Sequence, residues 1–313
     1  SGGQSGPPVE LKTIADVAHQ YELVDTAQGR KDLVEQLNGL PAFCFDLETT
    51  GLDVKRCGLV GIAFSWEAHR GFYVPVPVER TKALAMLEEF RPVFEGSAEK
   101  IGHNLKYDLG VLRWHGVSVA GPFFDTMLAA ALVDPDGRRG MDHLAQTLLN
   151  YQPIAISELI GEKGEEQLGM NLVPLDEIVE YAVEDADITW QLAALFREKI
   201  EEMGQKRVFY DIECPLLPVL VEMEHEGVRM ESDVLDAMAR QFQDHIEETA
   251  ARIYELAGEE FNLNSGQQLG AILFEKLALD PNARRTAKTG QFQTGEQVLR
   301  RLAYRYEIAQ RVL

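Results

Sequence analysis

The chain has 313 residues, of which 45% are hydrophobic and 26% are charged, a composition typical of globular proteins with one large domain or two ordinary ones. Its 30 Lys and Arg residues and 51 Asp and Glu residues give a formal net charge of −21, which argues against a protein held to nucleic acid or anionic lipid by bulk charge. No apolar run approaches the ~20 residues of a membrane-spanning helix, which excludes an integral membrane protein.

The cysteines and the N-terminal residues indicate a cytoplasmic protein without a disulfide framework. Cys44, Cys57 and Cys214 are odd in number and lack CxxC spacing, and the 7 histidines show no spacing typical of zinc ligands. A reducing compartment is therefore expected. Residues 1–9 have neither the basic start nor the apolar stretch of a signal peptide, and we expect a linker or cloning remnant there.

Hydrophobic patterns predict the elements of the first two thirds of the chain. Runs rich in β-forming residues predict strands at 42–45, 58–66 and 71–76, and a short segment follows at 100–103. Apolar residues at helical spacing predict helices at 80–95, 105–112, 123–133, 141–149 and 175–203, with an exposed loop at 161–169. Because strands come first and helices are interleaved later, the predicted class is α/β with a mixed sheet.

The pattern changes near residue 206, after which the chain is almost entirely helical in character. Helices are expected at 208–226, 232–257, 265–277 and 294–313, and only the β-like run at 227–230 interrupts them. Ser232 and Ser265 are expected as helix N-caps. The sequence thus predicts an α/β domain at 10–205 and a mainly α-helical region at 206–313.

Three segments carry carboxylates in patterns that point to a metal site. In the first, FDLETTGL, Asp46 and Glu48 follow an apolar strand two residues apart, so both side chains point to one face. Two adjacent carboxylates repel each other unless a cation intervenes, and hard oxygen ligands suit Mg²⁺ or Mn²⁺. The alternative is a strand that simply ends in a polar turn, which is the commoner case for an isolated DxE.

The second and third segments are helical. In GHNLKYD, Asn104 is placed to cap a helix, and Asp108 lies one turn later near an apolar face. In YAVEDAD, Tyr181 and Asp185 are four residues apart and share one helical face. We expect Glu180, Glu184 and Asp187 on a solvated face of this helix. Each segment alone is a weak signal, but together they form an ordered set.

The set resembles the DEDDy class of 3′→5′ exonucleases. The segments FDLETTGLD, IGHNLKYDLGVL and YAVEDADITWQL resemble the three exonuclease motifs of the bacterial DNA polymerase I family (family A), and FDTMLA and MDHLA between them also look like that family. After residue 210, GVRM, FNLNSGQQLGAILFEKL and TGQFQTGEQVLRRLA resemble the start of the polymerase thumb. The resemblance implies a ribonuclease H-like mixed β-sheet flanked by helices, followed by a partial thumb.

The resemblance also implies roles for individual residues. Asp46, Glu48, Asp108 and Asp185 would bind two divalent metal ions, Mg²⁺ or Mn²⁺, and Tyr181 would orient the attacking water. The substrate-binding residues implied by the family are Thr49, Leu52, His103, Asn104, Lys106, Tyr107, Arg138 and Met141. Arg139 and Lys163 are further candidates for contacts with the DNA backbone, with ordinary surface charge as the alternative.

The implied function is metal-dependent release of 5′-mononucleotides from the 3′ end of single-stranded DNA or a frayed primer terminus, as in proofreading. Because nothing resembles the family's palm and fingers motifs, we expect a fragment of a DNA polymerase whose polymerase domain is its natural partner, monomeric, cytoplasmic and associated with the bacterial nucleoid. The alternatives are a ribonuclease D-type enzyme that trims RNA and a non-catalytic exonuclease-like domain that binds DNA or acts as a scaffold.

The charge is unevenly distributed along the chain. Residues 281–313 contain seven Lys and Arg residues and two acids, a local charge of 7 − 2 = +5, which leaves −26 for the remainder. A basic C-terminal segment fits contact with a nucleic-acid backbone, so the net negative charge does not exclude DNA as a partner.

Overall fold

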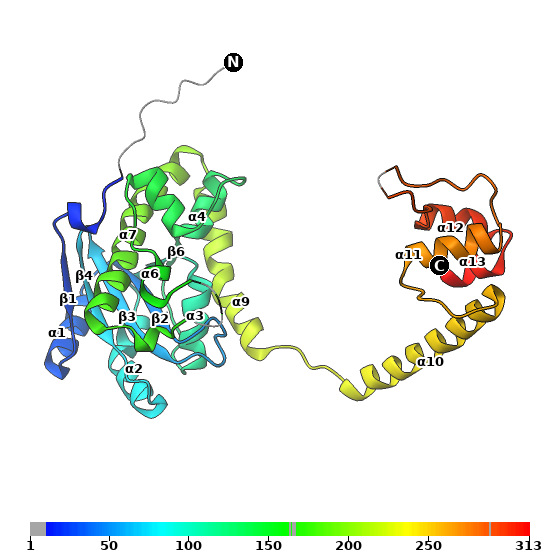
Figure 1. Cartoon of the computed structure of the whole chain (residues 1–313). Coiled ribbons are helices and arrows are strands. Elements are labelled where there is room, and N and C mark those ends of the chain that lie inside the picture. The colour runs from blue at the N-terminus through cyan, green and yellow to red at the C-terminus, as the bar shows by residue number, and fades with distance from the viewer. Residues whose placement is uncertain (1–10, 163, 165–166, 288) are drawn as a thin grey trace, which may run out of the picture. The chain divides into compact units, whose positions relative to one another are not determined.

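The computed structural model describes residues 11–162, 164, 167–287 and 289–313 (Figure 1). The predicted linker at 1–9 and Lys163 lie outside the described residues. The chain forms two compact units that divide at Gly227, and each has its own hydrophobic core. Within the described part of the chain, no helix is both long and apolar enough to span a membrane.

A mixed six-stranded sheet forms the centre of the first unit and confirms the predicted α/β class. Its order is β1-β4-β3-β2-β5-β6, with antiparallel pairs β2–β3 and β3–β4 and parallel pairs β1–β4, β2–β5 and β5–β6. The strands are β1 (Gln20–Leu23), β2 (Ala42–Thr49), β3 (Leu59–Glu67), β4 (Arg70–Pro75), β5 (Glu99–Gly102) and β6 (Phe123–Asp125).

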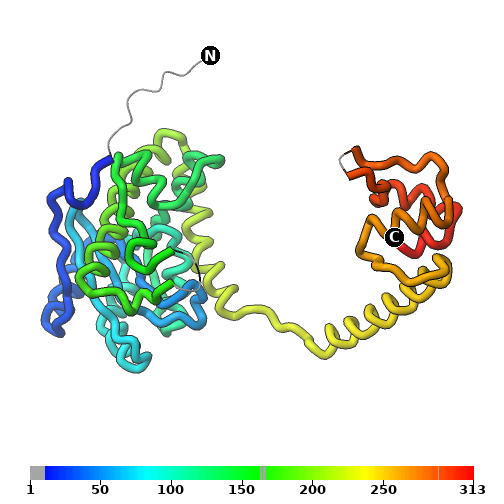
Figure 2. Tube along the Cα trace, in the orientation of Figure 1, coloured from blue at the N-terminus to red at the C-terminus, as the bar shows by residue number. Residues whose placement is uncertain are grey.

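Helices cover both faces of this sheet. The α-helices of the first unit are α1 (Ala27–Asn38), α2 (Arg80–Phe94), α3 (Leu105–Trp114), α4 (Thr126–Val133), α5 (Met141–Leu144), α6 (Ile156–Ile160), α7 (Leu175–Glu202), α8 (Lys206–Val208) and α9 (Cys214–Glu226). Figure 2 follows the same path of the chain as a tube. The ring of Phe45 on β2 contacts Phe94 of α2, whereas the next residue, Asp46, faces α7. Successive side chains of a strand point to opposite faces, so α2 and α7 lie on opposite sides of the sheet.

Two predictions need correction, and one strand and two α-helices of the first unit escaped prediction. Residues 123–125, expected to begin a helix, form strand β6, because they pair with β5 at the edge of the sheet before α4 begins. The run at 227–230 forms no strand, since no neighbouring strand pairs with it and Val228 is 88% exposed. Strand β1 and helices α1 and α6 were not predicted.

The second unit is helical, as predicted. It contains α10 (Ser232–Ala257), α11 (Gly266–Gly270), α12 (Glu296–Ala303) and α13 (Glu307–Val312), and the α-helical path continues from α11 as a π-helical segment at Ala271–Lys276. Its core joins Ile253 of α10, Leu273 of the π-helical segment and Leu302 of α12. The single helix expected at 294–313 is two helices, because Tyr306 between them adopts an extended backbone.

The two predicted N-caps of this unit have different outcomes. The Ser265 side chain accepts a hydrogen bond from the Gln268 backbone N–H and caps α11, as predicted. Ser232 is instead the first residue of α10, and the capping position belongs to Glu231, whose side chain makes no capping bond.

Candidate active site

Strand β2 presents Asp46 and Glu48 on the face of the sheet that α7 covers. Their partners in the β2–β3 ladder are small: Asp46 lies opposite Ala63, and Glu48 lies opposite Gly61. A Cβ atom at Gly61 would come within 2.0 Å of the Tyr73 hydroxyl, so only glycine fits this position. The absence of a side chain at Gly61 makes room for the Tyr73 ring, and the register shift between Glu48 and Thr49 ends the regular pairing just beyond the two carboxyl groups.

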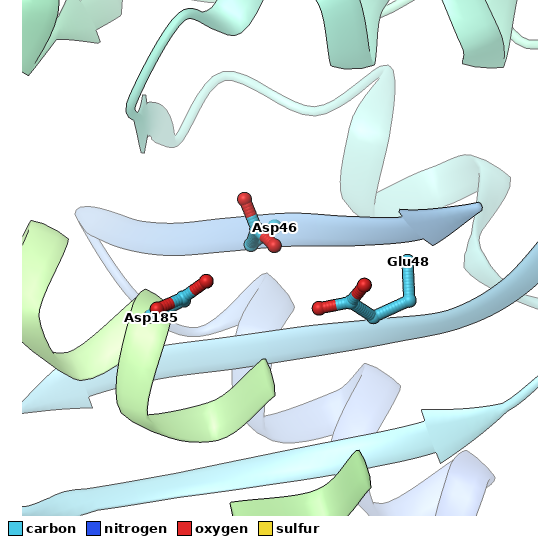
Figure 3. A group of neighbouring side chains, drawn as sticks. All are labelled: Asp46, Glu48 and Asp185. Carbon is cyan, nitrogen blue, oxygen red and sulfur yellow. The ribbon is translucent and has the colours of Figure 1, made fainter. Parts of the chain in front are cut away.

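Helix α7 adds a third carboxyl group. Oxygen atoms of Asp46, Glu48 and Asp185 all lie within 4.8 Å of one another, and Figure 3 shows the three carboxyl groups pointing into the space between β2 and α7. Tyr181 precedes Asp185 by four residues on the same helix, and its hydroxyl donates a hydrogen bond to the Asp185 carboxyl group. The structure therefore brings together residues from the first and third predicted segments.

Ionisation of each of the three carboxyl groups is unfavourable in this site. Burial raises the pKa of Asp46 to about 6, and burial followed by the charge of Asp46 raises the pKa of both Glu48 and Asp185 well above the usual range. Burial and the same three carboxylates also raise the pKa of the Tyr181 hydroxyl, so it remains protonated. Among the described residues, none of the main causes of these pKa shifts is the favourable charge of a lysine or arginine.

Asp108 lies beside this group of three rather than within it. It is 3% exposed in the first turn of α3, and its pKa is raised by burial and then by the charge of Asp46. Asn104 occupies the N-cap position of α3 as expected, but its side chain makes no capping bond and its backbone is left-handed, with φ 62°. Its predicted capping role is therefore wrong.

Asp125 supplies the cap that Asn104 does not. Its buried carboxylate accepts hydrogen bonds from the backbone N–H groups of Asn104 at 3.2 Å and Leu105 at 2.8 Å, at the start of α3. It also accepts from Met127 at 2.8 Å and Leu128 at 3.3 Å, at the start of α4. The sequence analysis includes Asp125 only within the family-like segment FDTMLA. Its position directly before α4 is the signal that would have identified it as a helix cap.

Three predicted substrate-binding residues gather where β2 ends. The Thr49 and Tyr107 hydroxyl oxygens are 2.6 Å apart, and the Tyr107 hydroxyl donates a hydrogen bond to the Gly51 carbonyl at 2.8 Å. Leu52 follows on the same loop and is 88% exposed. The end of β2 therefore presents two hydrogen-bonded hydroxyl groups and, on the loop that follows, one exposed apolar side chain.

The remaining predicted substrate contacts are more dispersed. His103 Nδ1 lies 2.8 Å from the Thr126 hydroxyl, burial lowers its pKa to about 4, and its Nε2 faces the Arg139 backbone without normal hydrogen-bond geometry. Lys106 Nζ lies 2.5 Å from a carboxylate oxygen of Glu224 on α9. Arg138 lines a separate cavity of about 190 Å³ together with His143 and Lys199, and the sulfur of Met141 accepts a hydrogen bond from Thr189 on α7.

Two further acids of α7 contradict the sequence-based expectation. Glu180 is exposed as predicted, but Glu184 and Asp187 are buried, with 0% and 2% of their surface exposed. Both carboxylates accept hydrogen bonds from segments distant in the sequence, which is why they leave the solvated face that a helical pattern alone predicts.

Comparisons with known proteins agree with the geometry. A family model described as 3′-5′ exonuclease matches residues 21–201, and one described as DNA polymerase family A matches residues 232–313. The chain is 35% identical over 300 residues to DNA polymerase I of Chloroflexus aurantiacus and 34% identical over 312 residues to that of Pseudomonas aeruginosa. These matches cover 93% and 96% of the chain but only 32% and 34% of the two relatives, so the chain spans about a third of their length.

Solved structures share the fold at lower sequence identity. The POL domain of Pol1 from M. smegmatis, in complex with DNA primer-template and dNTP, has a TM-score of 0.71 at 20% identity, covering 93% of this chain and 47% of that one. Brucella melitensis NrnC with bound Mg²⁺ has a TM-score of 0.53 at 20% identity, covering 67% of this chain and 95% of that one.

Proposed function

The chain belongs to the 3′-5′ exonuclease family found in DNA polymerase I, and we propose that it removes 5′-mononucleotides from the 3′ end of DNA by metal-dependent hydrolysis. The observation that carries this proposal is the group formed by Asp46, Glu48 and Asp185, whose carboxyl oxygens lie within 4.8 Å of one another. Such a group has little use in a folded protein unless a cation binds it, because mutual repulsion makes it unfavourable.

The donor set fits hard divalent cations. Mg²⁺ and Mn²⁺ prefer carboxylate oxygens, and the pKa of each of the three carboxyl groups is raised in a way that a bound cation would reverse. We propose that Asp46, Glu48 and Asp185 hold one ion and that Asp46 and Asp108 hold a second. When bound, the ions would neutralise phosphate charge and make water a better nucleophile.

The side chains of this site would position the reactants. The protonated Tyr181 hydroxyl, next to Asp185, would orient the attacking water, and Glu48 would accept a proton from that water. Thr49 and Tyr107 would contact the terminal nucleotide, and the exposed Leu52 would pack against its base. Asn104, His103, Lys106, Arg138 and Met141 remain proposed contacts to the rest of the strand.

The wider assignment follows the family. We propose that residues 10–205 form the exonuclease domain and that residues 206–313 begin the polymerase part, with proofreading of a frayed primer terminus as the role in the complete protein. The packing of α9 against α3 supports including α9 in the structural environment of the exonuclease site.

The test is release of mononucleotides from a 3′-labelled single-stranded DNA oligonucleotide in Mg²⁺ or Mn²⁺. Asp46→Ala and Asp185→Ala should abolish release, and Tyr181→Phe should slow it while retaining metal binding, because only the orienting hydroxyl is lost. Glu198→Gln, at an exposed position on α7, is the matched control. Full activity in either alanine variant would refute the metal assignment, and faster cleavage of an RNA oligonucleotide of the same sequence would favour an RNA-trimming enzyme.

A further inference from the structure

Buried hydrogen bonds hold the flank of α7 on which Glu184 and Asp187 lie. The Glu184 carboxylate accepts from the Tyr151 hydroxyl at 2.5 Å and from the Ile154 backbone N–H at 2.7 Å. The Asp187 carboxylate accepts from the Tyr21 hydroxyl at 2.8 Å and from the His69 backbone N–H at 2.9 Å. These donors come from strand β1, from the turn between β3 and β4, and from the segment that follows α5.

The opposite flank of the helix is held differently. With 3.6 residues per turn, each residue turns the helix by about 100°, so Glu184 and Asp187 lie about 100° and about 160° from Asp185 in one direction. Ala182 and Ala186 lie about 60° and about 100° from Asp185 in the other direction and are both fully buried. Ala182 and Ala186 have short side chains and by themselves offer little resistance to a small roll of α7 about its axis, whereas Val179 and Val183, farther round the same flank, are buried.

Packing is also incomplete beside Asp187. A cavity of about 220 Å³ is lined by Tyr21, His69, Tyr151, Asp187 and Ile188, among others. Because this space lies open beside the Asp187 carboxylate, the hydrogen bonds to that carboxylate contribute to how α7 sits on this flank.

Placement of α7 matters because this helix carries Asp185 and Tyr181. An atom about 6 Å from the helix axis moves by about 1 Å when the helix rolls by about 10°. A misplacement of about 1 Å can lower an enzymatic rate by about 100-fold. A small roll would therefore separate Asp185 from Asp46 and Glu48 without unfolding the protein.

We propose that Glu184 and Asp187 are positioning residues, which fix the rotation of α7 through Tyr151 and Tyr21 and thereby place Asp185 and Tyr181 at the metal site. They contact neither the reacting atoms nor the proposed ions. This inference rests on the proposed exonuclease function for its kinetic part, but the effect on metal binding does not require hydrolysis.

The test removes the donors and leaves the carboxylates in place. In the double variant Tyr21→Phe/Tyr151→Phe, kcat for single-stranded DNA should fall about 10-fold or more, while KM changes by less than about 3-fold, because the DNA contacts lie elsewhere. Mn²⁺ affinity, measured by calorimetry without DNA, should fall in parallel. The double variant Glu184→Gln/Asp187→Asn should largely retain both properties, because each amide can still accept the backbone N–H and the tyrosine hydroxyl can turn round to accept.

A matched control separates positioning from general loss of stability. Val93→Ala removes buried volume from α2 on the other face of the sheet and should lower the melting temperature while leaving kcat and Mn²⁺ affinity unchanged. The proposal is overturned if the double phenylalanine variant keeps wild-type Mn²⁺ affinity, or if Val93→Ala or the amide variant loses as much affinity. Normal Mn²⁺ binding by a wild-type protein that fails to hydrolyse DNA would refute the proposed function alone.

Discussion

Replacing Asp46 by asparagine should stabilise the metal-free protein while abolishing its exonuclease activity. In the folded protein, burial raises the pKa of the Asp46 carboxyl from its ordinary value of 3.8 to about 6. One pKa unit corresponds to about 1.4 kcal/mol, so ionised Asp46 lowers the free energy of unfolding by about 3 kcal/mol at neutral pH. For a unit of this size, relief of that penalty should raise the melting temperature by about 6–12 °C.

The pH dependence of this gain has a definite sign. Between pH 3.8 and about 6, the folded state binds more protons at Asp46 than the unfolded state does, so the free energy of unfolding falls as pH rises through this window. Asp46→Asn lacks that fall. The stabilisation should be absent near pH 4, grow towards pH 6 and remain constant above it.

Urea unfolding followed by tryptophan fluorescence is a suitable assay. All three tryptophans, Trp66, Trp114 and Trp190, lie in the first unit, so the signal reports the unfolding of that unit. Measurements in EDTA at pH 4 and pH 7.5 should show the gain only at the higher pH, and Asp211→Asn, at an exposed position, should show it at neither. A divalent ion at 100 times its dissociation constant should stabilise the wild type by about 2.7 kcal/mol and cancel most of the difference.

The reasoning fails if Asp46→Asn is no more stable than the wild type at pH 7.5 in EDTA. It also fails if the gain is as large at pH 4, because the stabilisation would then have a cause other than the charge. In either case, electrostatic repulsion would not be the reason for metal binding at this site.

Three further outcomes are expected. Lys100 is fully buried and its pKa is lowered to about 8, so the unfolding free energy should rise between pH 8 and 10.5 in the wild type but not in Lys100→Met, as urea titrations will show. Burial lowers the pKa of His103 to about 4, so the free energy of unfolding should fall as pH drops from 6.5 towards 4. In urea titrations, His103→Gln should remove that fall. Leu273→Ala should cost about 2–5 kcal/mol in the second unit, seen by circular dichroism, without moving the tryptophan transition of the first.

Local patterns were sufficient to predict the centre of the site. Asp46 and Glu48 share a face because strand side chains alternate, and Tyr181 and Asp185 share one because they are four residues apart on a helix. The resemblance added Asp108, which the structure places beside the other three. The ordered set of weak signals therefore identified residues that the fold brings close together.

Features that depend on distant partners could not be predicted in this way. Glu184 and Asp187 fit a solvated helix face by pattern, and only Tyr151 and Tyr21, 33 and 166 residues away, explain why they are buried. Strand β6 is extended because β5 lies beside it, although its sequence continues smoothly into a helix. The Asp125 carboxylate, which accepts the N–H groups of Asn104 and Leu105, lies 21 and 20 residues away from them in the sequence, so the local pattern could not identify it as the cap of α3.

The Asp125 carboxylate links two helices that are separate in the sequence. It accepts N–H groups at the start of both α3 and α4, so a single buried anion balances the positive ends of two helix dipoles. If the first turn of either helix unfolds, the Asp125 carboxylate loses half of its hydrogen-bond donors while it stays buried. We therefore expect the first turns of α3 and α4 to unfold together. Asp108 lies in the first turn of α3, so we expect its position beside the proposed metal ligands to depend on the start of α4 as well.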